Sequence, residues 1–324
     1  MSVRNLTRLH RPVWLLAASA AATFIIGADY SSAGIQGTGR MALLSFGRID
    51  GAGNTISVNG VDYSLSQAQI LIDGKAATPA QLKVGQIVTI QGSSKGATSG
   101  DANSVTFTAD VAGPVTQLDV AGGTFTVLGQ QVKVDADTVF AETMQPAGIG
   151  ALSVGTGVEV SAFRTASGEL LASRVDLQAA GAPLMVRGAV EALNADARTF
   201  QINDLTIAYT QSRVHGSLAN ASTATVTSGE APSAGTLQAA TVDVSNGVQG
   251  AAAGVSGQIQ GLITSLNSAS SFYVGDQRVV TNSETHFALQ RKTLQANLAV
   301  QIKGTFDSSG ALVAKQVYGD PKTP

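Results

Sequence analysis

Cysteine is absent from the 324-residue chain, and histidine occurs only three times. Without cysteine the chain can form no disulfide, bind no metal through thiolates and carry no lipid on an N-terminal cysteine. Only His215 and His286 lie beyond the N-terminal segment that ends at Ala33, so any imidazole chemistry of the remaining chain would depend on these two side chains. The absence of cysteine thus removes thiolate metal sites and cysteine nucleophiles.

Charged residues are also scarce, at 13% of the chain. Loss of the segment from Met1 to Ala33 would remove Arg4, Arg8, Arg11 and Asp29, leaving 17 of the 20 basic and 21 of the 22 acidic side chains. Neutralisation of phosphates by Lys and Arg supplies most non-specific affinity for nucleic acids. A mildly acidic chain without a basic stripe is therefore not expected to bind DNA or RNA.

Aromatic residues make up only 5% of the chain, and its single tryptophan, Trp14, lies in the N-terminal segment before Ala33. The phenylalanines of a repeated pattern are expected to fill hydrophobic cores: Phe125, Phe140, Phe200 and Phe287. Stacking of sugars or bases would depend on the remaining tyrosines: Tyr63, Tyr209, Tyr273 and Tyr318. Tyr273 follows Phe272 and should face outward, but a single exposed tyrosine on a strand is usually only a strand former.

The N-terminal segment from Met1 to Ala33 has the pattern of an export signal. A basic start is followed by the apolar run Val13 to Ile26 and by the small-residue cleavage site Ser31-Ser-Ala33. A membrane-spanning helix needs about 20 apolar residues, and this run is shorter, so an uncleaved N-terminal anchor is the alternative interpretation. We expect cleavage after Ala33. An exported chain without cysteine suggests the bacterial envelope, with the periplasm favoured over secretion or the cell surface.

A unit of about 65 to 70 residues repeats four times along the rest of the chain. Residues 111–180 hold the clearest copy, which opens at Gly113 and closes with Leu170 to Val175. The expected divisions are a signal peptide (1–33), a lead segment (34–45), repeat 1 (46–110), repeat 2 (111–180), a degenerate repeat 3 (183–246), a Gly/Ala linker (247–254), repeat 4 (255–319) and a tail (320–324). Repeat 3 is called degenerate because 216–235 is rich in Ser, Thr and Ala, with one strand pattern at 223–229.

One turn recurs at a fixed position in the units. Gly85 and Gly155 each lie three residues after a leucine and three before a valine of the next strand, and Asn297 holds that position in repeat 4. Glycine exchanged only for asparagine predicts a left-handed backbone conformation.

The last strand of the units shares the pattern Leu-x-Ala-x-x-Val, as in Leu170, Ala172 and Val175. Side chains of a regular strand alternate between faces, so Leu and Ala share one face and Val falls on the other. A bulge would return Val to the face of Leu and Ala, and bulges coil the strands of small barrels. The pattern therefore predicts a bulge between Ala172 and Val175; a strand buried on both sides is the alternative.

Each unit reads as five short strands with one helical turn between the third and the fourth. In repeat 1 that turn is Thr78-Pro-Ala-Gln-Leu82, with Thr78 as N-cap, and Asn59-Gly60 predicts a two-residue hairpin. This order is that of the five-stranded barrel of the oligonucleotide/oligosaccharide-binding (OB) type. The sequence thus predicts an all-β protein of four tandem OB-like barrels, with an open meander or sandwich as the alternative.

The succession of these motifs resembles the bacterial envelope family catalogued as domain of unknown function 5666. Repeat 2 carries the pattern best, in Gly113, Phe125-Thr-Val127, 135–140, 152–160 and 170–175, and repeat 4 carries it in Phe272, Thr285-His-Phe287 and 312–317. Repeats 1 and 3 match in part. The resemblance implies exported tandem β-domains with no established activity, and it supplies no catalytic residues.

The candidates for chemistry are few. His286 alternates with Phe287 and should face solvent. Asp135 and Asp137 could share a face and bind a hard cation, but the other oxygen ligands of a calcium loop are missing, which favours a solvated strand end. Three further acids have no evident partner: Glu142, Glu159 and Glu169. The motifs of serine hydrolases, P-loops and zinc peptidases are absent from the sequence, so no catalytic, cofactor or metal residue is assigned.

We expect a non-catalytic exported protein whose tandem β-domains bind a protein or glycan partner of the envelope. The alternative is a structural or surface-assembly spacer that associates with itself, and an envelope hydrolase is the less favoured third hypothesis. Membrane contact is expected only through the signal segment, if it is retained. A binding site is expected in loops where the copies differ.

Overall fold

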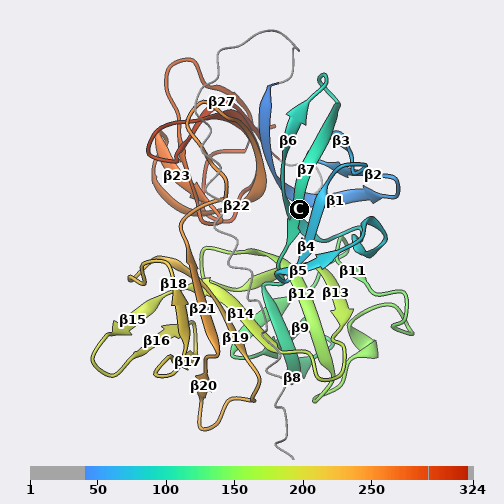
Figure 1. Ribbon diagram of the computed structural model, residues 1–324, viewed down its shortest axis with the longest axis vertical. Coiled ribbons are helices and arrows are strands. Elements are labelled where there is room, and N and C mark those ends of the chain that lie inside the picture. Colours follow the sequence, from blue (N-terminus) through green and yellow to red (C-terminus); the bar gives the residue numbers. More distant parts are fainter. Residues whose placement is uncertain (1–40, 291, 320–324) are drawn as a thin grey trace, which may run out of the picture. The chain divides into compact units, whose positions relative to one another are not determined.

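The computed structural model describes residues 41–290 and 292–319, which form the β-rich body in Figure 1. The expected signal peptide, most of the lead segment and the tail lie outside the described residues. Among the described residues, no helix has the length and hydropathy needed to cross a membrane. The prediction of an all-β chain is confirmed.

The strands and short 3-10 helices follow the four repeats in order. Repeat 1 contains β1 (Ala42–Ala52), β2 (Thr55–Val58), β3 (Val61–Ser64), β4 (Gln69–Ile72), β5 (Lys75–Ala77), η1 (Pro79–Gln81), β6 (Ile87–Ser94) and β7 (Ser99–Phe107). Repeat 2 contains β8 (Val111–Asp119), β9 (Thr124–Val127), β10 (Gln130–Lys133), β11 (Val139–Phe140), η2 (Ile149–Ala151), β12 (Gly157–Arg164) and β13 (Leu170–Leu177). Strand β1 thus begins inside the segment expected to be a lead.

The second half of the chain is built in the same way. Repeat 3 contains β14 (Leu184–Ala189), β15 (Glu191–Asn194), β16 (Thr199–Ile202), β17 (Leu205–Ala208), β18 (Arg213–His215), β19 (Thr223–Ser228), β20 (Thr236–Gln238) and β21 (Thr241–Ser245). Repeat 4 contains β22 (Ser256–Ser268), β23 (Ser271–Val274), β24 (Gln277–Val280), β25 (His286–Ala288), β26 (Ala299–Phe306) and β27 (Leu312–Gly319).

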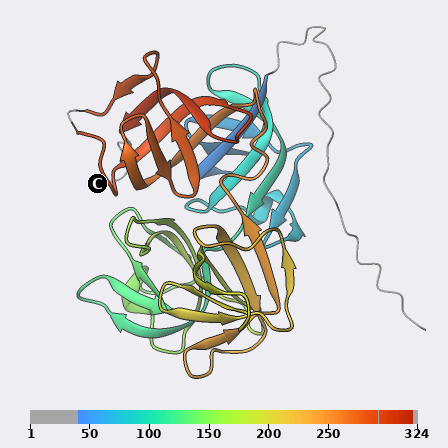
Figure 2. The same ribbon diagram turned by 90° about the vertical axis from the view of Figure 1, so that its left-hand side faces the viewer.

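Five strands close into a ring in repeats 1, 2 and 4. In repeat 2, β8 pairs with β9, β9 with β10, β10 in parallel with β13, β13 with β12, and β12 with β8 again. Repeats 1 and 4 close through the same succession of pairings. This is the five-stranded barrel of the OB type, and the closure rules out the open meander. Figure 2 shows repeat 4 as a curled sheet of red and orange strands.

Repeat 3 follows the same ring with two of its strands interrupted. Its first strand is divided into β14 and β15, and its last into β20 and β21. Pairings β14–β19–β21 and β15–β16–β17–β20 supply the two halves. Its core is continuous with that of repeat 2, which explains how a repeat with a weak sequence signal is still folded. The expected strand in the Ser/Thr/Ala-rich tract is β19.

The two predicted backbone features are present. Gly85, Gly155 and Asn297 all have positive φ, at 91, 91 and 64°. The register of β13 against β12 shifts so that Ser161 is opposite Arg174 while Ala162 is opposite Ala172. The bulge between Ala172 and Val175 is therefore confirmed. Equivalent shifts occur in the last strands of repeats 1 and 4.

Three local expectations had different outcomes. Thr78 caps η1, and its backbone N–H donates to Oε1 of Gln81 at 2.9 Å, as the helical turn requires. Asn59 has φ of 55° in the turn between β2 and β3, which confirms the hairpin. Phe125 and Phe200 are buried, but Phe287 is 40% exposed. The expectation that Phe287 fills a core was wrong, because β25 pairs only with β27 and lies at the rim of the barrel.

Candidate docking groove on repeat 4

Four polar side chains lie in register across the outer face of repeat 4. Gln258 of β22 is opposite Lys303 of β26, Lys303 is opposite Gln316 of β27, and Gln316 is opposite His286 of β25. The residues on either side of Lys303 along β26 are buried, so the row points away from the barrel core. His286 is exposed, as the sequence predicted.

The bulge of β27 adds a fifth polar side chain to this face. Gly304 is opposite Ala314 while Lys303 is opposite Gln316, which leaves Lys315 as the extra residue. Because a bulge places two successive side chains on one side, Lys315 and Gln316 are both exposed, whereas Ala314 before them is buried. The backbone feature read from the sequence thus determines what this face presents.

These residues line a groove of about 540 Å³, a size typical of ligand sites. The edge of the groove is formed by Leu43 of β1, since β1 and β22 pair in parallel. Two lysines and one histidine contribute to the lining against a single acid, Glu284. The face can therefore donate hydrogen bonds to carbonyl groups and attract negative charge.

The equivalent face of repeat 2 is already occupied by a loop of repeat 1. Gln316 corresponds to Arg174, because each is opposite the equivalent residue of the neighbouring strand. Arg174 Nη1 donates to the carbonyl of Val84 at 2.9 Å, and the backbone N–H of Ile87 donates to Ser161 Oγ at 2.9 Å. The turn of repeat 1 thus sits on the bulge of repeat 2.

The backbone of Gly85 lies very close to repeat 2 in this contact. A Cβ atom built on Gly85 would lie 2.9 Å from the carbonyl oxygen of Ser173, 3.0 Å from Cβ of Arg174 and 3.2 Å from Cβ of Val139. A side chain at position 85 would therefore separate the two repeats. Glycine is therefore required at position 85 both by the close contact with repeat 2 and by the left-handed turn.

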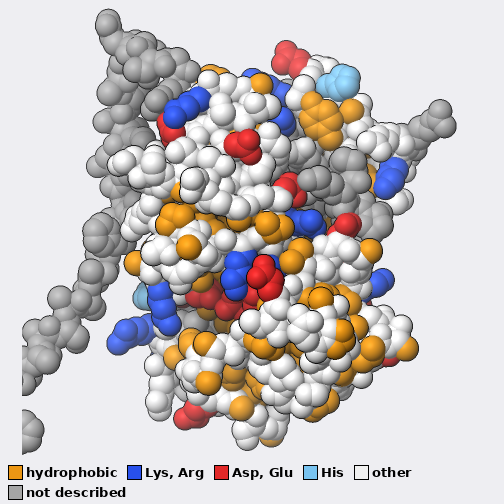
Figure 3. All heavy atoms as spheres, turned by 90° about the vertical axis from the view of Figure 1, so that its right-hand side faces the viewer, with side chains coloured by type: hydrophobic (Ala, Val, Ile, Leu, Met, Phe, Trp, Pro, Cys, Tyr) orange, Lys and Arg blue, Asp and Glu red, His pale blue; other side chains and the backbone are white. Residues whose placement is uncertain are grey.

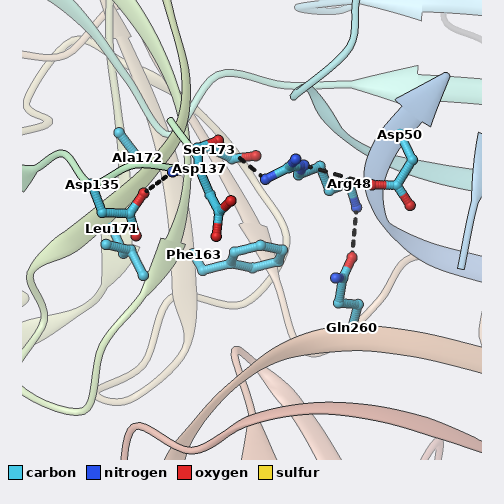
Figure 4. Close-up of a pocket in the computed structure, with 9 residues that line it drawn as sticks. All are labelled: Arg48, Asp50, Asp135, Asp137, Phe163, Leu171, Ala172, Ser173 and Gln260. Carbon is cyan, nitrogen blue, oxygen red and sulfur yellow. Dashed lines mark hydrogen bonds and ion pairs between the residues drawn. The ribbon is translucent and has the colours of Figure 1, made fainter. Parts of the chain in front are cut away.

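A second, much smaller cavity lies where repeats 1, 2 and 4 meet (Figure 4). Its volume of about 20 Å³ has room for water but not for a ligand. Arg48 crosses it, donating from Nη1 to the carbonyl of Asp137 at 3.2 Å and from its backbone N–H to Oε1 of Gln260 at 3.1 Å. The cavity is a joint between repeats.

Asp135 and Asp137 line this joint and hold a turn. Oδ1 of Asp135 accepts hydrogen bonds from the backbone N–H of Asp137 at 2.9 Å and from Thr138 Oγ1 at 3.1 Å. Within the described residues, no group of three or more His, Cys, Asp or Glu is placed to hold a metal ion. The hydrogen bonds of Asp135 show that the pair lies in a turn.

The contact between repeats 1 and 2 also brings charged groups together. Lys83 Nζ and Arg174 both bind the carboxylate of Asp176, with Lys83 at 3.0 Å and Arg174 Nε at 2.6 Å. The pKa of Glu159 is raised to about 7. Partial burial is the larger cause, and the negative charges of Asp73 and Asp176 add to it. Acidic and basic side chains gather side by side in the middle of the face in Figure 3. Glu159, singled out in the sequence, thus belongs to an interface.

The remaining candidates do not form a common site. His215 Nδ1 lies 2.7 Å from Asp243 Oδ1, but both side chains are largely exposed, and neither lines the groove or the joint. Glu142 is exposed, and Glu169 accepts a hydrogen bond from Ser167 at 3.1 Å. Tyr63 is fully buried, which removes it as a stacking platform. Tyr273 is partly exposed.

Sequence reasoning missed the groove, although a signal was present. The two residues between Ala and Val of the closing pattern are Ser173-Arg174 in repeat 2 and Lys315-Gln316 in repeat 4. The pattern locates the bulge, and the residues that differ within it mark a face that varies between the copies, although they do not show what covers that face. The candidate groove is lined mainly by strand residues, whereas a binding site was expected in the loops.

Comparison with known families agrees with the repeat pattern. Residues 112–176 and 260–318 match the family described as domain of unknown function (DUF5666). This is a repeat-containing, DUF5666-like protein. The two matched segments are most of repeats 2 and 4, the copies for which the resemblance was strongest.

Other comparisons add little to this assignment. No curated protein matches the chain. A solved structure titled "drosophila Unr CSD456" aligns over 60% of this chain and 91% of its own, with 12% identity and a TM-score of 0.18. That likeness supports no inference, and the assignment of the OB-type barrel rests on strand pairing.

Proposed function

We propose that this DUF5666-like chain is an exported, non-catalytic binding protein of the bacterial envelope. Its binding surface is the groove on repeat 4, and its ligand is a loop of a protein. One observation carries the proposal: the equivalent face of repeat 2 binds the turn at Gly85 through backbone carbonyl and N–H groups, while in repeat 4 the same face is an open groove.

The choice of a protein loop over a glycan follows from that equivalence. Repeat 2 holds its loop through main-chain atoms of Val84 and Ile87, which any polypeptide turn of the same shape would present. Sugar recognition favours an exposed aromatic ring for stacking, and the lining of the groove contains none. Phe287 is exposed beside it but does not line it.

The export signal supports the location. The basic start, apolar run and cleavage site at Ala33 are a secretory pattern, and we place the mature chain in the periplasm. N-terminal sequencing of the mature protein tests this part, with Gly34 as the expected first residue. A mature chain that retains Met1 would contradict it.

The binding function can be tested with a photo-crosslinking amino acid at position 315, in the groove. We expect crosslinks from the probe at position 315 to one protein, and the loss of these crosslinks when His286→Trp fills the groove. The control carries the same probe at position 120, since Val120 is 51% exposed on repeat 2. Equal crosslinking from both positions, or binding only of neutral or acidic oligosaccharides, would overturn the proposal.

A different observation supports the spacer hypothesis as a second candidate function. The repeats are joined by main-chain hydrogen bonds as well as by side chains: β8 pairs with β14 across repeats 2 and 3, and β1 pairs with β22 across repeats 1 and 4. Such joints suit a structural role. A spacer built only from such strand joints leaves the groove empty, so the absence of crosslinks from position 315 would favour it over the binding function.

A further inference from the structure

The loop that docks inside the chain has an exposed copy in repeat 2. The turn of repeat 1 is closed by the backbone N–H of Lys83, which donates to Oε1 of Gln86 at 2.9 Å, and the turn of repeat 2 is closed by Ser153, which donates to Thr156 Oγ1 at 3.2 Å. Gly85 and Gly155 have the same φ of 91°. The two turns therefore share one backbone shape.

Their surroundings differ completely. Gly85 is buried against repeat 2, whereas a Cβ on Gly155 would have no atom within 4 Å. Val154, at the tip of the second turn, is 67% exposed, the highest exposure among the large hydrophobic residues described. A single exposed valine is common on protein surfaces, so what marks this turn is the shape that it shares with the docked turn at Gly85.

The chain thus carries uncovered copies of both halves of an interface it already makes. The equivalent turn of repeat 3, around Ala221, is exposed too, but its tip holds Asn220 in place of a hydrophobic residue. The used halves are the turn at Gly85 and the bulge of β13. The unused halves are the turn at Gly155, here called the free turn (residues 152–156), and the groove on repeat 4. We propose that the free turn of one chain docks in the repeat 4 groove of a second copy of the same chain.

The residues of the groove can accept that turn. Gln316 stands where Arg174 stands in repeat 2, and its amide can donate to the carbonyl of Val154 as Arg174 donates to that of Val84. Lys303 stands where Ser161 accepts a backbone N–H. Its ammonium cannot accept one, so the contact has fewer hydrogen bonds than the internal joint and is weaker.

The geometry also determines the form of the assembly. Turn and groove are different surfaces, so the contact is heterologous, and each chain that docks its turn leaves its own groove free for another. Repetition gives head-to-tail association. A single loop covers less than a standard interface, so association depends strongly on concentration and is favoured where chains are crowded.

This inference rests on the proposed function, since it names the partner that the groove binds. It is tested by sedimentation velocity of the purified chain over about a hundredfold range of concentration. We expect the mean sedimentation coefficient to rise with concentration in the natural chain. Val154→Lys, whose charge the groove lysines Lys303 and Lys315 would repel, and His286→Trp, which fills the groove, should each abolish the rise, whereas the control Val120→Lys should retain it.

Mixing the two defective variants gives the sharpest result. One variant keeps an intact groove and the other an intact turn, so an equimolar mixture should form pairs but no larger species. A natural chain that stays monomeric throughout, or a Val154→Lys chain that associates like the natural chain, would overturn self-docking. Crosslinks from position 315 to a different protein would then leave the proposed function standing, and their absence would remove both.

Discussion

The backbone N–H of Ala221 donates a hydrogen bond of 2.8 Å to the carbonyl of Val190. Gly155 makes the same bond to Val115, also at 2.8 Å. Ala221 therefore occupies the left-handed turn position in repeat 3, with φ of 66°. Alanine thus fills in repeat 3 the position that holds Gly or Asn in the other repeats. The cost to alanine is about 1–2 kcal/mol, which a core shared with repeat 2 can offset.

Replacing Ala221 by glycine should stabilise the chain by about 0.5–1 kcal/mol, because relief of the left-handed strain exceeds the extra entropy of glycine in the unfolded state. Gly155→Ala should destabilise it by about 1–2 kcal/mol for the same reason, since nothing crowds that position. Urea unfolding measures both. A destabilising Ala221→Gly would show that the turn is not strained.

Glu159→Gln should change the dependence of stability on pH. A folded-state pKa of about 7, raised from 4.5 by burial and neighbouring acids, favours the protonated form in the folded chain. The resulting stability is fully present below pH 4.5 and is lost as the pH rises through 7. Glutamine mimics the neutral form, so the variant should match the natural chain at pH 5 and exceed it by about 1–2 kcal/mol at pH 8.

Urea unfolding at both pH values gives this difference directly. Glu142→Gln is the matched control, since Glu142 is an exposed acid of the same repeat. Equal shifts in the two variants would contradict a special environment at Glu159.

Gly304→Ala should destabilise the chain by about 2–3 kcal/mol. A Cβ there would collide with the carbonyl oxygen of Val313 beside the bulge of β27. Gly51→Ala, where the added atom would meet only Cβ of Ser57 at 3.6 Å, should change stability little. Thermal unfolding of both variants tests whether the bulge brings the strands as close as described. Equal effects would argue against it.

Gln316→Arg should strengthen self-association about fivefold to tenfold. The change installs in repeat 4 the side chain that donates to Val84 in repeat 2, and a hydrogen bond from a charged donor contributes about 1.5–3 kcal/mol, reduced by the flexibility of an arginine without a partner like Asp176. Sedimentation equilibrium measures the constant. An unchanged constant would show that the turn does not lie over position 316.

Much of the scaffold could be predicted from the sequence because backbone geometry limits the choice of residue. Gly155 and the spacing of Ala172 and Val175 indicate a left-handed turn and a bulge directly. The sequence pattern of repeat 3 is hard to recognise because alanine occupies position 221 and two of the strands are interrupted. Its packing against repeat 2 supplies what its local sequence lacks.

The groove could not be predicted because it depends on which copy of a surface remains uncovered. Nothing in Ser173-Arg174 or Lys315-Gln316 alone says that the first pair is buried by repeat 1 and the second is exposed. That difference arises from long-range packing. The exposure of Phe287 was missed for a related reason, since its strand has a partner on one side only.

The most direct test of self-docking uses the absence of cysteine from the chain. One preparation carries Val154→Cys and another Gln316→Cys, and the two are mixed under mild oxidation. We predict a disulfide-linked heterodimer that forms many times faster than either homodimer, well beyond the twofold excess of random pairing, and that is suppressed by His286→Trp in the Gln316→Cys chain. Crosslinking at the ratio of random pairing, with the heterodimer only twice as abundant as each homodimer, would contradict docking of the free turn in the repeat 4 groove.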